Sequence, residues 1–308
     1  MNIKKAVLIL SVSVIFIAAA VFSVVQISGS KPPKQTPDDN ISTGTNITVP
    51  TPEPTAEITP TPEPAATPNN EKTHLGDLNI VDISALDSTA VTWGPGNSFN
   101  DKNQPTANVA LQEKYGDLGA VFLSDDDKIY LTFDLGYEAG YTNDILDVLK
   151  ETDTKAVFFL TGSYAEKQEE IVRRIIDEGH TVGNHSYSHP DMPTLSDSEA
   201  ALEITKVGDI LKDKYGYDSY LFRFPAGTFS QRTVAIAAQN GYHSVFWSFA
   251  YNDWDNANQP DKTQALQKLT DRLHPGAVYL LHPMQTNSLI LKDFITNARN
   301  AGYEIGAM

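Results

Sequence analysis

The sequence predicts an α/β fold for residues 128–308, in the form of a distorted (β/α)7-type barrel with a parallel sheet. Three observations lead to this prediction. Apolar runs of strand length alternate six or seven times with amphipathic stretches of helix length. Such repeats imply parallel strands joined by right-handed crossovers. Titratable residues follow several of the apolar runs, where parallel α/β folds carry their functional groups. A doubly wound open sheet is the alternative, because periodicity alone does not separate it from a barrel.

Each element has its own local signal. The strands are short apolar runs, expected at 128–133, 156–160, 180–183, 220–224, 244–247, 277–281 and 303–305. Apolar side chains at helical spacing predict helices between them, at 141–150, 171–176, 196–211, 232–240, 266–273 and around Phe294. Ser196 and Glu199 have the spacing of a capping box that opens the third helix, and Gly179 and Gly241 end the second and fourth.

The composition excludes several kinds of site. The 308 residues contain no cysteine, which excludes disulfides, a thiolate nucleophile, a cysteine-bound metal and a lipid anchor on cysteine. The 39 acidic and 23 basic side chains leave a net charge of −16, which repels phosphate groups and argues against a nucleic acid partner. Any metal site must therefore be built from histidine and oxygen ligands.

The first 30 residues have the pattern of an export or anchoring segment. Lys4 and Lys5 precede an uncharged apolar run from Ala6 to Ile27, which is long enough to span a bilayer. We therefore expect residues 1–30 to form an uncleaved signal-anchor, with the lysines in the cytoplasm and the remainder of the chain outside the membrane. Cleavage after Ala20, or in the serine-rich stretch that follows, would instead give a secreted protein.

Residues 31–72 are expected to be a disordered linker. They contain ten of the 18 prolines and nine threonines, and Thr-Pro-Glu-Pro occurs at both 51–54 and 61–64. A segment with so few large apolar side chains cannot bury enough surface to offset its ordering entropy. It would hold the remaining residues away from a membrane as a semi-stiff stalk. We expect residues 73–127 to form an extension packed on the barrel, and residues 128–308 to form the barrel itself.

The ends of the predicted strands carry the candidate functional residues, which are Asp134, His185, His189, Arg223, Asp253 and His282. Taken singly, most of them have ordinary explanations. Two histidines four residues apart suit a divalent metal, but isolated histidines are more often surface or core residues. An aspartate beside Gly136 can be a turn former, and Arg223 can be part of an ordinary ion pair. Their shared position at one mouth of the sheet is what indicates a site.

His282 and Trp254 have the more specific single signals. His282 ends the apolar strand at 277–281, and its ordinary pKa suits proton transfer near neutral pH. Trp254 follows Asp253 and is the tryptophan expected to line a sugar site, whereas tryptophans in general belong to the core.

Together these residues resemble the five motifs of the polysaccharide deacetylase family, the NodB-homology carbohydrate esterases of family 4. The motifs occur in order as Thr132-Phe133-Asp134, His185-Ser186-x-x-His189, Arg223-x-Pro225-x-Gly227, Asp253-Trp254 and Leu280-x-His282. The resemblance covers residues 128–305 and implies the NodB barrel. It is closer still to the sporulation-type muramic acid de-N-acetylases, through the stretches 130–141, 183–186, 245–248 and 275–282.

The resemblance implies hydrolysis of an acetamide on a cell-wall polysaccharide, most closely on N-acetylmuramic acid in peptidoglycan. Asp134 would be the general base, His282 the general acid and Arg223 the partner that keeps Asp134 ionised. Asp253 would complete the catalytic set by orienting either His282 or Arg223. The backbone N–H of Ala226 would donate to the oxyanion. The resemblance also assigns a substrate groove, lined by Trp254, Leu280 and Tyr137.

The same resemblance implies a divalent metal, with zinc preferred, held by His185 and His189. The family's usual aspartate ligand is replaced here by Leu135, which cannot coordinate a metal. Asp191, two residues after His189, is a candidate substitute ligand. This departure keeps a second hypothesis open, a glycan-binding relative without catalysis. Deacetylation of another polysaccharide, such as N-acetylglucosamine units of peptidoglycan, chitin oligomers or xylan, is a third.

The expected partners are peptidoglycan or a related N-acetylated glycan and, through residues 1–30, the membrane. The expected location is extracytoplasmic. A matched acid and base favour an active enzyme over a glycan-binding protein, because binding alone needs neither group.

Overall fold

The structure is a computed structural model, and it describes residues 75–308. The predicted signal-anchor at 1–30 and the predicted linker at 31–72 lie outside the described residues. Within residues 75–308, no helix combines the length and the apolar character needed to cross a membrane.

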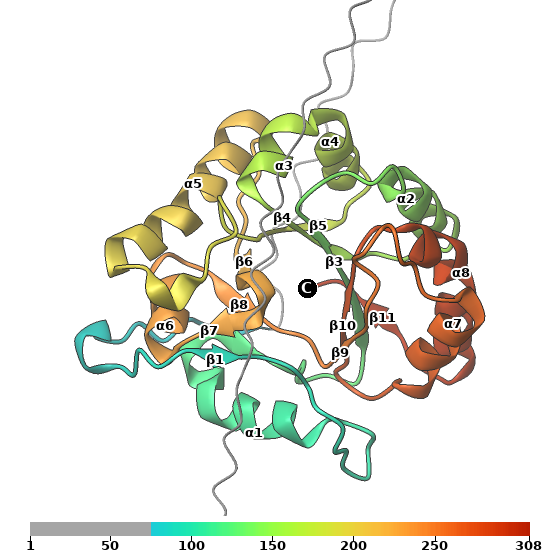
Figure 1. Cartoon of the computed structure of the whole chain (residues 1–308), viewed down its shortest axis with the longest axis horizontal. Coiled ribbons are helices and arrows are strands. Elements are labelled where there is room, and N and C mark those ends of the chain that lie inside the picture. Colours follow the sequence, from blue (N-terminus) through green and yellow to red (C-terminus); the bar gives the residue numbers. More distant parts are fainter. Residues whose placement is uncertain (1–74) are drawn as a thin grey trace, which may run out of the picture. The chain divides into compact units, whose positions relative to one another are not determined.

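A parallel sheet of nine strands forms the centre of the molecule (Figure 1). Its hydrogen-bonded order is β2-β8-β6-β5-β4-β3-β10-β9, and β11 pairs with the start of β3. The strands are β2 (Ala120–Val121), β3 (Ile129–Leu135), β4 (Val157–Leu160), β5 (Thr181–Asn184), β6 (Leu221–Phe222), β8 (His243–Val245), β9 (Phe249–Ala250), β10 (Val278–Leu281) and β11 (Ile305–Gly306). The alternation of strands and helices therefore produces the predicted parallel α/β sheet.

The sheet wraps around as a barrel but remains open on one side. β3 to β8 follow one another around the ring, and β10 returns to pair with β3. Among the described residues no pairing joins the two edge strands, β2 and β9. The structure is thus an open barrel, which is consistent with the distorted barrel that the sequence predicts. Closure fails because β8 pairs with β2 of the N-terminal extension, and β9 pairs with β10 alone.

The helices lie outside the ring of strands, as Figure 1 shows. They are α2 (Thr142–Glu151), α3 (Gly162–Lys167), α4 (Glu169–Asp177), α5 (Asp197–Tyr215), α6 (Gln231–Gln239), α7 (Lys262–Asp271) and α8 (Gln285–Asn300). The predicted capping box opens α5, because the Ser196 hydroxyl accepts from Glu199 N–H and the Glu199 carboxylate accepts from Ser196 N–H. Gly216, with φ +67°, ends this helix in the left-handed conformation.

The alternation of side chains along β3 divides the core. Leu131, Phe133 and Leu135 belong to the outer cluster, which packs under helices α2, α7 and α8. Tyr130 belongs to the inner cluster of the barrel, and Asp134 points to the same side as Tyr130 because it is four residues further along the strand. The C-terminal Met308 is buried in this inner cluster, where its carbonyl accepts a hydrogen bond from Thr181. The inner face of the sheet is therefore apolar near the amino ends of the strands and carries Asp134 near the carboxyl end of β3.

The N-terminal extension covers the open side of the barrel. It contains the 3₁₀ turn η1 (Ile83–Ala85), β1 (Val91–Thr92), α1 (Thr106–Tyr115), the 3₁₀ turn η2 (Gly116–Leu118) and β2. Asn108 donates to the carbonyls of Phe122 and Trp247, while Asn103 donates to the carbonyls of Asp271 and Leu273. The extension thus bridges the two sides of the gap. It also contributes the edge strand β2 to the main sheet, so the sheet begins before residue 128, where the barrel was expected to start.

The element bounds differ from the expected ones mainly at the strand ends. β3 extends to Leu135, so Asp134 lies within the strand, because β4 pairs with β3 as far as Leu160. β6 is shorter than expected, since Pro225 in the 3₁₀ turn η4 (Pro225–Gly227) lacks an N–H for the ladder. η4 leads into β7 (Thr228–Phe229), which pairs with β1 in a separate antiparallel sheet. The short helix α3 gave no periodic signal in the sequence, and Thr161 caps it.

Candidate active site

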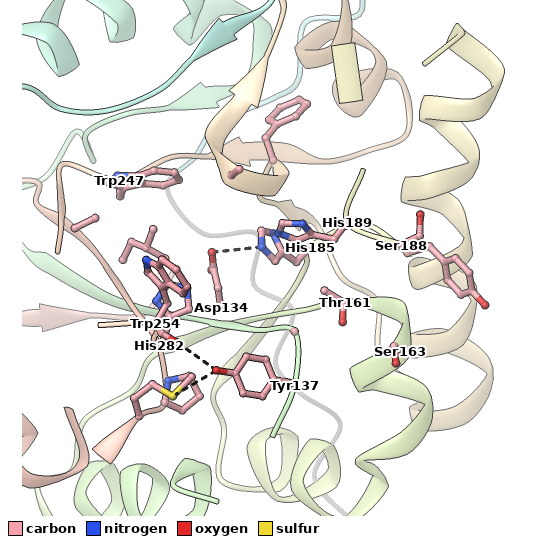
Figure 2. A pocket seen from close by; sticks show the side chains of 18 of the residues that line it. Asp134, Tyr137, Thr161, Ser163, His185, Ser188, His189, Trp247, Trp254 and His282 are labelled. Atoms are coloured by element: carbon pink, nitrogen blue, oxygen red, sulfur yellow. Dashed lines mark hydrogen bonds and ion pairs between the residues drawn. The ribbon is translucent and has the colours of Figure 1, made fainter. Parts of the chain in front are cut away.

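A cavity of about 750 Å³ opens at the carboxyl ends of the strands (Figure 2). The structure brings most of the predicted site residues to its walls, namely Asp134, Tyr137, His185, His189, Ala226, Trp254, Leu280 and His282. Arg223 and Asp253 lie behind these walls and are fully buried. Asp191 is exposed and does not line the cavity. The volume is typical of a small-molecule or sugar subsite.

Asp134 and Arg223 form a buried ion pair at the base of the cavity. Arg223 Nη1 donates to Asp134 Oδ1 at 2.9 Å and to the Thr132 hydroxyl at 2.7 Å. Arg223 Nε donates to the carbonyl of Val245, and the guanidinium stacks on the ring of Phe159. The guanidinium is completely buried, so its place is set by the barrel interior rather than by solvent.

The environment of Asp134 keeps its carboxylate ionised. Burial alone would raise the pKa of Asp134, but the adjacent Arg223 charge, helped by His185 and His282, holds the pKa below its ordinary value. Asp134 Oδ2 is left facing the cavity and lies 3.5 Å from His185 Nε2. One carboxylate oxygen is therefore held by arginine and the other is available for proton transfer.

The two histidines lie next to each other on a tight turn after β5. Their ring centroids are 4.9 Å apart with planes at 79°. Both Ser186 and His189 have positive φ angles, and the turn is held by Asn184, whose side chain accepts from Ser186 N–H. His185 Nδ1 lies 2.9 Å from the Arg223 carbonyl, so this nitrogen carries the proton and Nε2 is a lone-pair donor. Burial lowers the pKa of His185 to about 4, which keeps the ring neutral.

These donors do not make up a complete zinc site. Catalytic zinc normally keeps three protein ligands. Within residues 75–308 no group of three or more histidine, aspartate or glutamate side chains is placed to hold a metal ion. The position of the family's third ligand is Leu135, whose side chain is buried in the outer core away from Asp134. Two neutral imidazoles alone do not fit a three-ligand centre, so we derive no catalytic step through a metal.

Asp253 holds His282. The two partners expected for this aspartate were His282 and Arg223, and its carboxylate contacts His282. The imidazole Nδ1 lies 2.8 Å from Asp253 Oδ1, and the backbone N–H of His282 donates to Oδ2 at 2.8 Å. The second ring nitrogen is thereby left for the cavity that His282 lines. Burial lowers the pKa of His282, but the hydrogen bond and charge of Asp253, together with Asp134, outweigh it and leave the pKa raised.

These pKa directions predict the pH dependence of the acetamide hydrolysis that the family resemblance implies. Asp134 stays ionised down to a pH below 3.8, and His282 stays protonated to a pH above 6.5. We expect kcat/KM to fall on the alkaline side as His282 deprotonates, and Asp253→Asn to move that limb to lower pH because the anion that favours the imidazolium is gone. The check is a kcat/KM profile of both proteins, and an alkaline limb at the same pH in both would contradict the assignment.

The Ala226 backbone lies in a strained turn that faces the cavity. Its φ of +51° is in the left-handed region, which is uncommon for a residue other than glycine. The Arg223 carbonyl, which would accept the Ala226 N–H in a regular 3₁₀ turn, is held by His185 instead. Gly227 is required because a Cβ there would lie 2.6 Å from the ring of Trp247. The turn thus places the Ala226 backbone at the cavity wall, where its N–H is the candidate donor.

Two aromatic side chains form an exposed platform at the cavity mouth. Tyr137 and Trp254 are each 55% exposed, which is unusual for large aromatics on this chain. The Tyr137 hydroxyl donates to the Trp254 carbonyl at 3.2 Å and so connects the two (Figure 2). Leu280 lies deeper in the wall and is buried. Flat apolar faces beside polar catalytic groups suit the stacking of a sugar ring.

Two residues beside this site, Asn287 and Tyr251, were not predicted from the sequence. Asn287 contacts both Asp253 and the His282 carbonyl, and Tyr251 lines the cavity and contacts Asn287. Asn287 is the third residue of α8 and five residues after His282. Its position could have indicated this role, because Asn287 lies in the first turn of the helix that follows β10 and His282. A polar side chain in such a turn can face the end of the strand.

The fold and the paired carboxylate and imidazole groups define a hydrolytic enzyme on an open α/β barrel. Residues 124–245 match the family model described as polysaccharide deacetylase. The peptidoglycan-N-acetylmuramic acid deacetylase PdaA of Bacillus subtilis is 37% identical over 223 residues, which are 71% of this chain and 84% of that protein. The chain belongs to the polysaccharide deacetylase family, carbohydrate esterase family 4, and is a hydrolase of carbon–nitrogen bonds other than peptide bonds.

Solved structures agree with this membership. The structure of Bacillus subtilis PdaA, described as a family 4 carbohydrate esterase, superposes with a TM-score of 0.66 at 36% identity and covers 71% of this chain and 95% of its own. BA3943 from Bacillus anthracis, described as a family 4 pseudoenzyme, superposes with a TM-score of 0.56 at 31% identity, covering 59% of this chain and 64% of its own. The family therefore includes proteins named as deacetylases and a protein described as a pseudoenzyme.

Proposed function

We propose that this protein removes acetyl groups from the amide nitrogens of peptidoglycan, and that it acts on N-acetylmuramic acid. The observation that carries the proposal is a single cavity that contains one group able to accept a proton and one group able to donate a proton. Asp134 is held ionised by Arg223, and His282 is held protonated by Asp253. The choice of sugar is supported by the similarity to PdaA, whose name gives muramic acid as its substrate.

The chemistry follows from the states of these two groups. Asp134 Oδ2 accepts a proton from a water molecule as that water attacks the acetamide carbonyl carbon. The carbonyl oxygen gains negative charge, which the Ala226 N–H stabilises. The carbon–nitrogen bond then breaks, and His282 donates its proton to the departing sugar nitrogen. The products are acetic acid, which ionises to acetate in solution, and a free amine. Asp134 then releases its proton to solvent and His282 takes one up from solvent, which restores both groups for the next cycle.

The experiment is to incubate the purified protein with insoluble peptidoglycan and measure released acetate and new primary amines. Mass analysis of the digested glycan then assigns the lost acetyl group to the muramic acid or the glucosamine unit. We expect acetate and amine in equal amounts and the loss on muramic acid, and His282→Ala should abolish both signals. Loss on glucosamine alone would keep the deacetylase but reject the sugar. Acetate without amine would indicate hydrolysis of an O-acetyl ester, and the same assay on acetylated xylan would then test that substrate.

A glycan-binding role without catalysis is the second candidate. Leu135 in place of a metal ligand, and the similarity to a family member described as a pseudoenzyme, both favour it. The two hypotheses separate in the same assay, because a binding protein would be retained on peptidoglycan and release no acetate with zinc or any other divalent metal added. Asp134, Arg223, Asp253 and His282 favour catalysis, since binding alone requires no matched acid and base.

We further propose that the protein works outside the cytoplasm, held at the membrane by residues 1–30. The apolar run from Ala6 to Ile27 and the proline-rich stretch after it support this placement. Fractionation of cells that express the full chain tests it, because an anchored protein stays with the membranes until residues 1–30 are removed. Recovery in the medium would show that the segment is cleaved.

A further inference from the structure

We infer that Asn287 is a positioning residue for the reaction, which extends the Asp253–His282 pair into a relay of four side chains that ends at Tyr251. The inference rests on the proposed function, in which His282 is the general acid. It concerns a residue on α8 that is 1% exposed and does not line the cavity.

The contacts of Asn287 tie both halves of the acid together. Its Nδ2 donates to Asp253 Oδ2 at 2.6 Å and to the His282 carbonyl at 2.8 Å. Asp253 Oδ2 also accepts the backbone N–H of His282, so one carboxylate oxygen and one amide group fix the backbone of His282 on both sides. The remaining oxygen of Asp253 is then directed at the imidazole. A buried side chain with these two partners restrains the ring more than Asp253 could do alone.

Tyr251 sets the orientation of the Asn287 amide. The Tyr251 hydroxyl donates to Asn287 Oδ1 at 2.5 Å. A flipped amide would place its oxygen against the carboxylate of Asp253 and the carbonyl of His282, and its NH₂ against a hydroxyl, which would lose both donations. The orientation is therefore determined by the partners. Because Tyr251 also lines the cavity, the relay connects the substrate site to the back of the imidazole.

The relay has a chemical consequence for His282. The Asn287 amide donates to Asp253 Oδ2 and so draws part of the carboxylate charge away from the oxygen that faces the imidazole. The charged groups that act on His282 are Asp253, Asp134 and Arg223, and Asn287 modulates the nearest of them. Removal of the amide should raise the pKa of His282, because the carboxylate of Asp253 then attracts the imidazolium more strongly. It should also leave the ring less well positioned, because the His282 carbonyl loses its donor. A residue that only supports the fold would do neither.

The test uses NMR titration of His282 in the intact protein, together with steady-state kinetics. In Asn287→Ala we expect the His282 titration to move upward by about half a pH unit, and kcat to fall about tenfold with KM changed less than twofold. Tyr251→Phe, which keeps the ring and removes only the hydroxyl, should shift the titration in the same direction by less. Tyr251→Phe also serves as the test if Asn287→Ala does not fold.

The matched control is Asn297→Ala, an asparagine on the same helix whose side chain hydrogen-bonds Thr270 and, among the described residues, neither Asp253 nor His282. It should leave both the titration and kcat unchanged. An unmoved His282 titration in Asn287→Ala, or the same losses in Asn297→Ala, would overturn the inference. The two failures are distinguishable, because the titration needs no substrate. A wild-type protein without acetate release would reject the proposed function while the titration still tests the relay.

Discussion

We expect Asp134→Asn to lower the rate of acetate release by about a thousandfold or more, and to leave a folded protein that still binds peptidoglycan. The amide has the shape of the carboxylate but cannot accept a proton from water, so the general base is lost. Its oxygen can still accept the Arg223 Nη1 hydrogen bond, which in the native protein is 2.9 Å long. Because the substitution leaves Arg223 as a buried charge without its counterion, we expect a loss of stability of about 3 kcal/mol, partly offset by this retained hydrogen bond.

Two measurements separate catalysis from stability in this variant. Acetate release gives the rate, and urea unfolding gives the free energy of unfolding. Asp293→Asn is the matched control, because Asp293 is an exposed aspartate on α8 without a described ion pair, and it should change neither quantity. If Asp134→Asn keeps more than about a tenth of the native rate, the base must be another group, since general-base losses are about a hundredfold or larger.

The parallel sheet and the position of the catalytic residues could be predicted because they depend on local patterns. The apolar run before His282 indicates a strand, and a titratable residue at its end indicates the mouth of the sheet. The same logic placed Asp134 and the two histidines on one cavity. Each of these inferences needs only a short stretch of chain and the rule that parallel strands end at one edge.

The features that the sequence did not predict depend on partners far apart along the chain. β2 is two residues long, and it becomes a strand only because β8, more than 100 residues later, pairs with it. The open barrel follows from that pairing. Asn287 looks like any polar residue in a first helical turn until the fold brings Asp253 and Tyr251 to its amide. Neither periodicity nor a motif carries such information.

The metal prediction shows a limit of a different kind. The spacing of His185 and His189 correctly indicated adjacent imidazoles, and the structure places their ring centroids 4.9 Å apart. The ligand count, however, depends on where Leu135 points, and the alternation along β3 directs it into the outer core. A carboxylate introduced at this position would therefore be buried among leucines rather than placed beside the histidines. Leu135→Asp is for this reason a test of stability before it is a test of metal binding.

Arg223→Met destabilises the protein by about 3–5 kcal/mol at neutral pH, because it leaves Asp134 as a buried carboxylate without its counterion. The loss depends on pH with a definite sign. In the native protein the lowered pKa of Asp134 contributes stability that is present above pH 3.8 and is lost as the pH falls through the folded-state value. In the variant, burial raises the pKa instead, so stability is lost as the pH rises. The difference between the two proteins should therefore be smaller near about pH 3, where mainly the lost hydrogen bonds to Thr132 and Val245 remain, and larger near about pH 7.

Urea unfolding at the two pH values measures this difference, and two further variants interpret it. Arg223→Met combined with Asp134→Leu removes both charges and should recover part of the loss, though not all, because the Thr132 hydroxyl and the Val245 carbonyl lose their donor. Arg173→Met, which breaks an exposed pair with Glu169, should cost less than about 1 kcal/mol at either pH. A pH-independent loss in Arg223→Met would mean that the guanidinium acts through its packing on Phe159 and its carbonyl partners, and that Asp134 is kept ionised by other groups.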